Sequence, residues 1–301
     1  MRRPVARPIA SRSLAEKSCT GGGLGATSAA NDSVLGRHLR ISATRLETIS
    51  SRLGEDDRVV LNFVSQCRLA SGTQLVRRFW LTANRDTAAA RAGRRTLKRL
   101  ADWRVLDPLP IRSVGGLHGG SDTLIYGVGV AGVKLLSRRG LVQKRLGAPG
   151  ARYVKHTLAC TELVVALHEA DRDGVLELIE IQSEPACWRG FLGAMGARLV
   201  LKPDLFVRVG AGSVSEDRWL IEVDLATEAT GTIGAKAKRY LAHYRAGSEQ
   251  VHPRVLWIVP DERRAEQIVG ALERLPATSR RMFSVCRFEQ TIDFLATEAS
   301  S

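Results

Sequence analysis

The sequence predicts two domains, an α+β domain in the first half of the chain and an α/β domain with a mixed sheet in the second. Three observations favour this division. The chain has 301 residues, which is long enough for two hydrophobic cores. Residues 1–157 hold 28 Lys and Arg against 10 Asp and Glu, whereas residues 158–301 hold 17 against 21. The pattern of expected elements also changes there, from helices followed by a hairpin to alternating strands and helices.

The composition is that of an ordinary globular protein, with 44% hydrophobic and 25% charged residues. No apolar run approaches the ~20 residues that cross a bilayer, and the basic start lacks the apolar segment of a secretory signal. The five cysteines are odd in number and form no CxxC pair, which argues against a disulfide framework or a zinc site. We therefore expect a cytoplasmic protein that does not associate with membranes.

Residues 1–54 are expected to form a disordered basic leader. Up to about residue 35 the chain is rich in Arg, Ser, Gly and Ala, without sustained periodicity. The segment 35–53 could be a helix or an arm.

Residues 55–150 are predicted to form a DNA-binding domain. Apolar spacing predicts three helices, and two strand-like runs then flank the glycine-rich segment GGLHGGS. A further helix closes the domain. Three helices followed by a hairpin with a glycine-rich tip is the order of a winged helix-turn-helix. The ranges are 56–69, 73–81 and 85–103 for the helices, 109–114 and 122–128 for the strands, and 130–140 for the closing helix.

The third of these helices carries a row of cations opposite its apolar face. A helix of this kind fits the major groove and its phosphates, while the hairpin tip lies along the backbone or the minor groove. The alternative is a solvated helix face on a winged helix that binds protein. The positive charge of the whole half favours double-stranded DNA. The candidate DNA-binding residues are Arg85, Arg91, Arg94, Arg95, Lys98, Arg99 and, at the hairpin tip, His118.

Residues 151–301 are predicted to form a mixed α/β domain around one central sheet. The order of the elements is α-β-β-β-α-β, extended by α-β-α, which resembles the core of the restriction-endonuclease-like superfamily. The helices are expected over 156–172, 232–247, 262–275 and 289–296, and the strands over 175–182, 204–209, 218–225, 254–260 and 282–288.

Acidic residues occur where this order would bring two neighbouring strands together. Pro203-Asp204 precedes one strand, and Glu222-Val-Asp224 ends the next. The pattern resembles PD-(D/E)xK nucleases, in which two such acids share a divalent cation because Mg²⁺ takes oxygen ligands and the carboxylates otherwise repel. The alternative is that these acids face solvent and have no role in a site.

The expected lysine is replaced by Asp224, so a lysine from the following helix, Lys236 or Lys238, would have to serve. We predict Asp204, Glu222, Asp224 and Lys236 as catalytic residues. The predicted ligands of Mg²⁺ or Mn²⁺ are Asp204, Glu222 and Glu162, the last from the preceding helix.

Other motifs carry less weight. His156 could cap a helix or contact DNA, and a structural role is favoured. GVGVAG at 127–132 lacks the GxGxxG spacing of a dinucleotide loop. We find no Ser/His/Asp or Cys/His arrangement for nucleophilic catalysis.

An ordered set of segments between about Asp56 and Pro260 resembles the replication-relaxation family of actinobacterial plasmids and mobile elements. The segments are RRTLKRLADWRVLD, YGVGVAGVKLL, KHTLACTEL, LKPDLFVRV, WLIEVDLATEAT and KAKRYLAHY. The resemblance implies a DNA-associated role in replication, relaxation or mobilisation. It also implies relaxosome or replication proteins, or a second copy of the chain, as partners. Asp204, Glu222, Asp224 and Lys236 match the PD, ExD and helix-lysine positions of the family.

The leading expectation is a DNA-binding protein of a plasmid or mobile element with a nuclease-like second domain. One alternative is an active Mg²⁺-dependent DNA endonuclease that nicks or cleaves. A second is a winged-helix transcriptional regulator.

Overall fold

The structure is a computed structural model that describes residues 40–81, 87–113, 123–141, 149–210, 216–247 and 251–299. The elements discussed below all belong to one compact unit, residues 41–301. None of the helices in these ranges is both long enough and apolar enough to cross a membrane.

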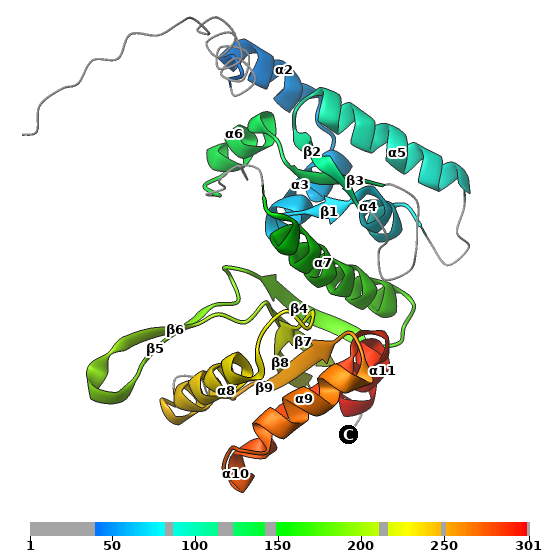
Figure 1. Cartoon of the computed structure of the whole chain (residues 1–301). Coiled ribbons are helices and arrows are strands. Elements are labelled where there is room, and N and C mark those ends of the chain that lie inside the picture. The colour runs from blue at the N-terminus through cyan, green and yellow to red at the C-terminus, as the bar shows by residue number, and fades with distance from the viewer. Residues whose placement is uncertain are drawn as a thin grey trace, which may run out of the picture. The chain divides into compact units, whose positions relative to one another are not determined.

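The first group of elements combines helices with a small antiparallel sheet (Figure 1). The sheet has the strand order β1-β3-β2. Ser71 caps α4 by accepting a hydrogen bond from the Gln74 backbone N–H, and this capping box explains the break expected after the preceding helix. The elements are α2 (Ala43–Arg52), α3 (Glu55–Cys67), β1 (Ala70–Ser71), α4 (Gly72–Phe79), α5 (Thr87–Asp102), β2 (Leu106–Ser113), β3 (Thr123–Val128) and α6 (Val130–Arg138).

Helix α2 lies within the segment that was expected to belong to a disordered leader. It is amphipathic, and Leu46 and Ile49 are buried. Glu47 accepts a hydrogen bond from Arg138 of α6 at 2.9 Å, and Lys134 of α6 donates to the carbonyl oxygen of Ile41 at 2.9 Å. The described chain is therefore already helical before residue 55. Residues 1–39 lie outside the described residues.

The glycines of the GVGVAG segment have a packing role. A Cβ atom at Gly129 would collide with the carbonyl oxygen of Arg104, and one at Gly132 with that of Val105. The two glycines let the start of α6 lie directly against the turn between α5 and β2.

The second group of elements forms a mixed α/β structure, as the sequence predicted. Its five-stranded sheet has the order β10-β9-β8-β7-β4, in which β10, β9 and β8 are parallel and β8, β7 and β4 are antiparallel. The elements are α7 (Ala151–Arg172), β4 (Glu177–Ser183), β5 (Arg189–Leu192), η1 (Ala194–Gly196), β6 (Arg198–Leu201), β7 (Leu205–Gly210), β8 (Glu216–Val223), α8 (Thr230–Arg245), β9 (Arg254–Val259), α9 (Glu262–Leu272), α10 (Ala277–Arg280), β10 (Phe283–Arg287), η2 (Phe288–Gln290) and α11 (Thr291–Ala299).

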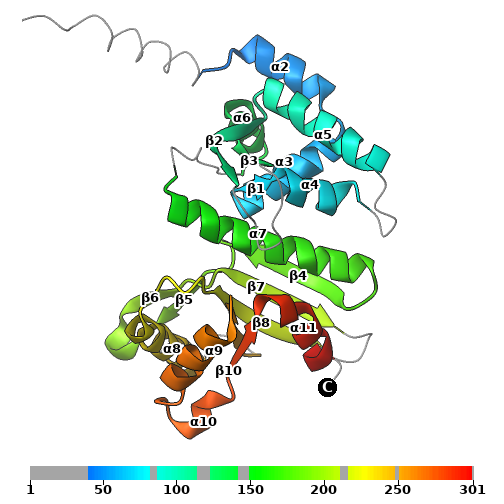
Figure 2. The same cartoon turned by 45° about the vertical axis from the view of Figure 1, so that its right-hand side comes forward.

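Helices cover both faces of this sheet (Figure 2). Along β8, Trp219, Ile221 and Val223 pack into the core formed with α7 and α11, whereas Leu220 packs into the core formed with α8 and α9. Because side chains alternate along a strand, Glu222 is directed towards α8. Burial on both faces of the sheet explains why β9 is almost continuously apolar and why β8 is apolar from Trp219 to Ile221.

The hairpin of β5 and β6 and the short helix α10 were not expected. The two strands pair antiparallel with each other and form a separate two-stranded sheet. Figure 1 shows the hairpin extending away from the five-stranded sheet.

Candidate functional site

Asp204 and Glu222 lie opposite each other at one end of β7 and β8. The register pairs Leu205 with Ile221, which places Asp204 one step beyond, across from Glu222. The Asp204 backbone N–H donates to the carbonyl oxygen of Ile221 at 3.0 Å. The Val223 backbone N–H donates to Asp204 Oδ2 at 2.7 Å. The structure thus brings these two acids together from adjacent strands.

Glu222 is a buried carboxyl held by two residues of α8. Lys236 Nζ lies 3.0 Å from Glu222 Oε2, and the Tyr240 hydroxyl donates to Glu222 Oε1 at 2.6 Å. Only 3% of Glu222 is exposed. Burial, followed by the negative charge of Asp204, raises the pKa of Glu222 to about 7, although the Lys236 ammonium opposes the shift.

The structure distinguishes between the two lysines that the sequence left open. Lys236 is half-buried and also lies 3.3 Å from Glu228, whereas Lys238 is exposed. Burial alone would lower the pKa of Lys236, but Glu222 and Glu228 together raise it above its ordinary value. The side chain directed at the acids is therefore that of Lys236, in its charged form.

Asp224 is held by a different cation. Arg264 of α9 donates two hydrogen bonds to its carboxylate, at 2.9 and 2.8 Å, and both side chains are buried. The Ala226 backbone N–H also donates to Asp224. This fork fixes the end of β8 to α9. Arg264 was not identified from the sequence, because nothing in its local spacing points to a partner forty residues earlier.

Glu162 lies apart from the other predicted ligands. It accepts hydrogen bonds from Arg77 and from Gln74 Nε2, the latter at 3.0 Å, and so connects α7 to α4. Glu162 is two positions after Cys160 on α7, so its side chain is turned by roughly 200° about the helix axis relative to that of Cys160. The structure does not bring Glu162 to Asp204, whose neighbours on α7 are His156 and Cys160.

His156 joins the site from α7. Its Nε2 lies 3.1 Å from the carbonyl oxygen of Val223 and 3.4 Å from Asp204 Oδ2. The interaction with Asp204 raises the pKa of His156, and burial opposes that shift. The sequence left His156 as a cap or a DNA contact, since only the fold brings it to Asp204.

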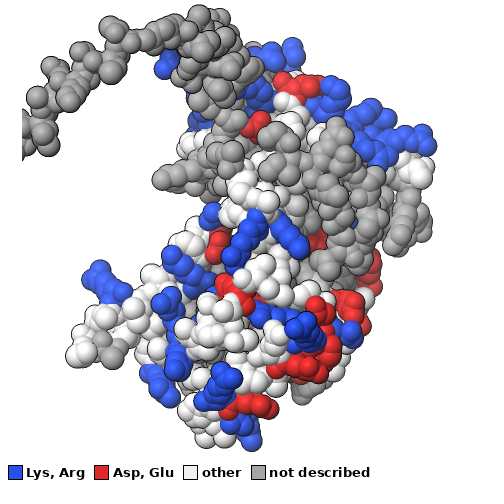
Figure 3. All heavy atoms as spheres, viewed as in Figure 1, with Lys and Arg blue, Asp and Glu red and all other residues white. Residues whose placement is uncertain are grey.

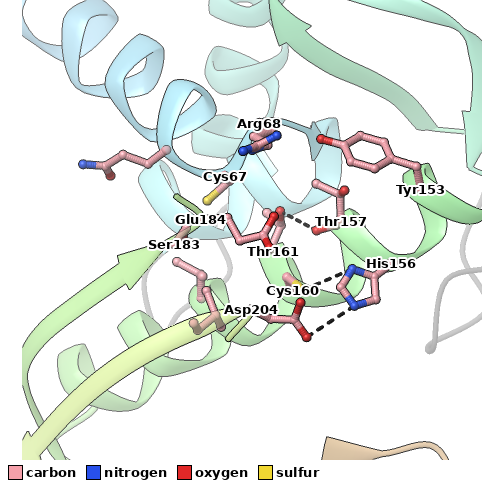
Figure 4. A pocket seen from close by; sticks show the side chains of 13 residues that line it. Cys67, Arg68, Tyr153, His156, Thr157, Cys160, Thr161, Ser183, Glu184 and Asp204 are labelled. Carbon is pink, nitrogen blue, oxygen red and sulfur yellow. Dashed lines mark hydrogen bonds and ion pairs between the residues drawn. The ribbon is translucent and has the colours of Figure 1, made fainter. Parts of the chain in front are cut away.

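A cavity of about 200 Å³ lies beside His156 and Asp204. Figure 4 shows the side chains that line it, with dashed lines joining His156 to Cys160 and to Asp204. Glu184 and Cys67 also line the cavity.

The second predicted site is the basic face of α5. Figure 3 shows Lys and Arg side chains gathered over this helix. Arg91, Arg94 and Arg95 are exposed, and among the described residues no ion pair involves them. Lys98 is also exposed and pairs with Asp102 at 2.9 Å.

Arg99 is held more firmly than its neighbours on α5. It pairs with Asp57 at 2.6 Å and lies over the ring of Trp103. Arg99 therefore anchors α5 to the start of α3. Arg85 and His118, the other two candidates, lie outside the described residues.

A family model described as replication-relaxation matches residues 61–256, which is more than half of the chain. The match runs from α3 to β9 and includes α5, Asp204, Glu222 and Lys236. No curated protein and no solved structure matches the chain.

Proposed function

The chain belongs to the replication-relaxation family, and from this premise we propose that it binds double-stranded DNA in the replication or relaxation of a plasmid or mobile element. The observation that carries the proposal is the exposed basic face of α5. A surface that is rich in Lys and Arg and poor in acids attracts the phosphates of a duplex.

The element order supports a winged-helix assignment for the region around α5. Three helices, α3, α4 and α5, precede the hairpin of β2 and β3, and β1 completes the small sheet. In a winged helix the third helix enters the major groove. We assign that role to α5.

The spacing of the cations on α5 suits this role. Arg91, Arg94, Arg95 and Lys98 follow positions i, i+3, i+4 and i+7, so they form one stripe along the helix. The three arginines would lose no ion pair to the described residues when they contact phosphate. The Lys98–Asp102 pair is exposed, and such pairs contribute only about 0–1 kcal/mol. DNA could therefore replace it at little cost.

The test is the salt dependence of duplex binding by the triple variant Arg91→Ala/Arg94→Ala/Arg95→Ala. Each phosphate contact contributes a slope of about −0.9 to log affinity against log salt, so losing three contacts should reduce the slope by about 2.7. The matched control is Arg263→Ala/Arg274→Ala/Arg281→Ala, which removes the same charge from exposed positions of the second half. Equal slopes for the two triple variants would contradict the assignment of α5.

Metal-dependent DNA cleavage is a second candidate, favoured by the cluster of Asp204, Glu222 and Lys236. Strand β8 pairs antiparallel with β7 and parallel with β9, and Asp204 just before β7 lies opposite Glu222 of β8. This arrangement supports a restriction-endonuclease-like assignment for this region. The donor set fits Mg²⁺ or Mn²⁺, because two carboxyls stand at opposite positions of adjacent strands and the charge of Asp204 raises the pKa of Glu222. A divalent cation bound to both acids would relieve this repulsion.

In this candidate reaction Asp204 and Glu222 would hold the cation, and Lys236 would position a water or a phosphate oxygen. Such a cation supplies charge neutralisation and acidifies bound water. Asp224 has no part, because Arg264 occupies both of its oxygens.

Nicking of supercoiled plasmid with Mg²⁺ or Mn²⁺ tests this candidate. We expect activity in the unmodified chain, loss in Asp204→Asn, and retention in Glu266→Gln, which changes an exposed acid on α9. Absence of nicking with either cation would contradict cleavage but would leave DNA binding through α5 intact.

A further inference from the structure

We propose that His156, Cys160 and Asp204 form a binding site for a transition-metal cation of the Zn²⁺ class. One ligand atom from each residue lies within 4.8 Å of the other two. Figure 4 shows the three side chains converging at the wall of the cavity. This site differs from the proposed Mg²⁺ pair of Asp204 and Glu222. The two share Asp204, but the new site uses neither Glu222 nor any residue of α8.

The first argument is the spacing of two ligands on one helix. His156 and Cys160 are four residues apart on α7, so their side chains lie on the same face, one turn apart. Two ligands at this spacing are a recurrent way to hold zinc on a helix. Cys160 Sγ already lies 3.8 Å from His156 Nδ1. Tetrahedral Zn²⁺ with one sulfur and one nitrogen ligand places the two ligand atoms roughly 3.6 Å apart.

The second argument is the orientation of the His156 ring. A carbonyl oxygen can only accept a hydrogen bond, so the 3.1 Å contact with Val223 places a hydrogen on Nε2. In the neutral ring the lone pair is then on Nδ1, the nitrogen that faces Cys160. Metal-bound histidines almost always donate their other ring N–H to a carbonyl or carboxylate in this way.

The third argument is the charge around the cavity. The carboxylates of Asp204 and Glu184 both act to raise the pKa of His156 and that of Cys160. Negative potential of this kind attracts a cation. Glu184 lines the same cavity and adds to this potential, and a water can supply the fourth ligand.

The donor set selects the class of cation. Thiolate and imidazole suit Zn²⁺ and similar transition metals, whereas Mg²⁺ and Ca²⁺ take oxygen ligands. On binding, the cation replaces the proton of Cys160, which leaves to solvent, and no oxidation state changes. At acid pH the second proton of His156 leaves as well, so affinity rises with pH.

The same three side chains do not suit a Cys–His–Asp nucleophile. Burial raises the pKa of Cys160 well above its ordinary value, and the neighbouring acids add to the effect. A nucleophilic cysteine needs the opposite shift, towards the thiolate. A bound cation supplies the positive charge that stabilises the thiolate here.

Cobalt titration of the full, metal-free chain without DNA tests the proposal. We expect one Co²⁺ per chain, a near-ultraviolet thiolate-to-cobalt band and the visible bands of tetrahedral cobalt. Zn²⁺ should displace the cobalt, and excess Mg²⁺ should not. Cys160→Ser should abolish the near-ultraviolet band. His156→Ala should weaken cobalt binding by at least the roughly 10- to 100-fold that loss of an outer-shell partner costs.

Two cysteine variants are the matched controls, and both should keep the band. Cys67→Ser changes a second cysteine that lines the cavity, and Cys286→Ser changes a buried one elsewhere. No band in the unmodified chain, a band that persists in Cys160→Ser, or one that disappears in Cys67→Ser would overturn the proposal. The circular dichroism spectrum of each variant checks that it folds.

Glu222→Gln separates this site from the proposed nuclease. It removes one carboxyl of the Mg²⁺ pair but none of the three ligands, so the cobalt spectrum should not change. A spectrum lost in Glu222→Gln would show that cobalt binds at the acid pair and would contradict the assigned ligands. Since neither DNA nor cleavage enters these measurements, their outcome is independent of the proposed function.

Discussion

The basic face of α5 and the charged cluster around Glu222 differ in what holds their side chains. Arg91, Arg94 and Arg95 are exposed and, among the described residues, have no ion pair. Glu222 is 3% exposed and contacts both Lys236 and Tyr240. The first surface is available to a partner, whereas the second is already engaged with the protein.

Because of this difference, charge-removing substitutions in the two regions should affect different properties of the protein. Exposed charges add little to stability, so a change in α5 should act on the proposed binding to DNA rather than on the fold. Buried charges are costly when one partner is removed, so a change near Glu222 affects stability and chemistry together. The size of the change in stability when a charge is removed should therefore follow its burial, and four predictions test this relation.

The largest effect is expected for Arg264→Ala. It leaves Asp224 buried without its cation, which should lower the free energy of unfolding by about 3–5 kcal/mol. Urea denaturation measures the loss. In the double variant Arg264→Met/Asp224→Leu no charge remains, and most of the stability should return. A loss below about 1 kcal/mol in the single variant would break the relation between burial and cost.

Glu222→Gln should instead increase the free energy of unfolding, and only at pH values above about 4.5, where the carboxyl would ionise in the unfolded chain. The pKa of Glu222 is about 7 in the folded chain against an ordinary value of 4.5. The carboxyl therefore destabilises the fold as pH rises from 4.5 to 7, and the penalty is complete above pH 7. At 1.36 kcal/mol per pKa unit the penalty is on the order of 3 kcal/mol.

The measurement for this variant is a series of thermal melts from pH 4 to pH 8 in the presence of a chelator. Glu222→Gln should gain stability relative to the unmodified chain as pH rises. A difference that does not depend on pH would contradict the raised pKa.

Arg77→Met should have an intermediate effect. Its side chain is 24% exposed and pairs with both Glu162 and Glu169, which joins α4 to α7. Methionine keeps most of the volume but leaves Glu162 and Glu169, whose side chains are 13% and 24% exposed, without their cation. We expect a loss of about 1–3 kcal/mol in urea denaturation. A loss as large as that of Arg264→Ala would show that the burial of a charge does not determine how much stability its removal costs.

The smallest effect is expected for the triple variant of Arg91, Arg94 and Arg95. Its free energy of unfolding should stay within about 0.5 kcal/mol of that of the unmodified chain, while the proposed affinity for DNA should fall. A loss of more than about 1 kcal/mol would indicate that this face of α5 packs against another part of the chain.

The sequence predicted the elements well where apolar residues recur at a regular period. The helix α3 follows such a pattern, and β9 was recognised as a continuous apolar run. The hairpin of β5 and β6 was missed because each of its strands is only four residues long and only partly buried. Phe191 and Leu201 are buried, whereas Leu192 and Val200 are exposed. Helix α2 was left open because its pattern is short.

Only the part of the candidate site that follows from the pairing of adjacent strands could be predicted from the sequence. Adjacent strands bring Asp204 to Glu222, and a helix after β8 can present a lysine. Contacts between distant elements decided the rest. Arg264 pairs with Asp224, and Arg77 pairs with Glu162. His156 contacts Asp204 from α7. None of these contacts can be recognised from the residues next to either partner in the sequence.

The backbone of Val223 contacts both Asp204 and His156. Its N–H group orients the Asp204 carboxylate, and its C=O group orients the His156 ring. Its side chain is 4% exposed and packs in the core. A change of volume at this aliphatic position, such as Val223→Ala, would displace both polar groups at once. An alteration with no chemistry of its own can thus impair the acid–imidazole geometry as much as replacement of a ligand.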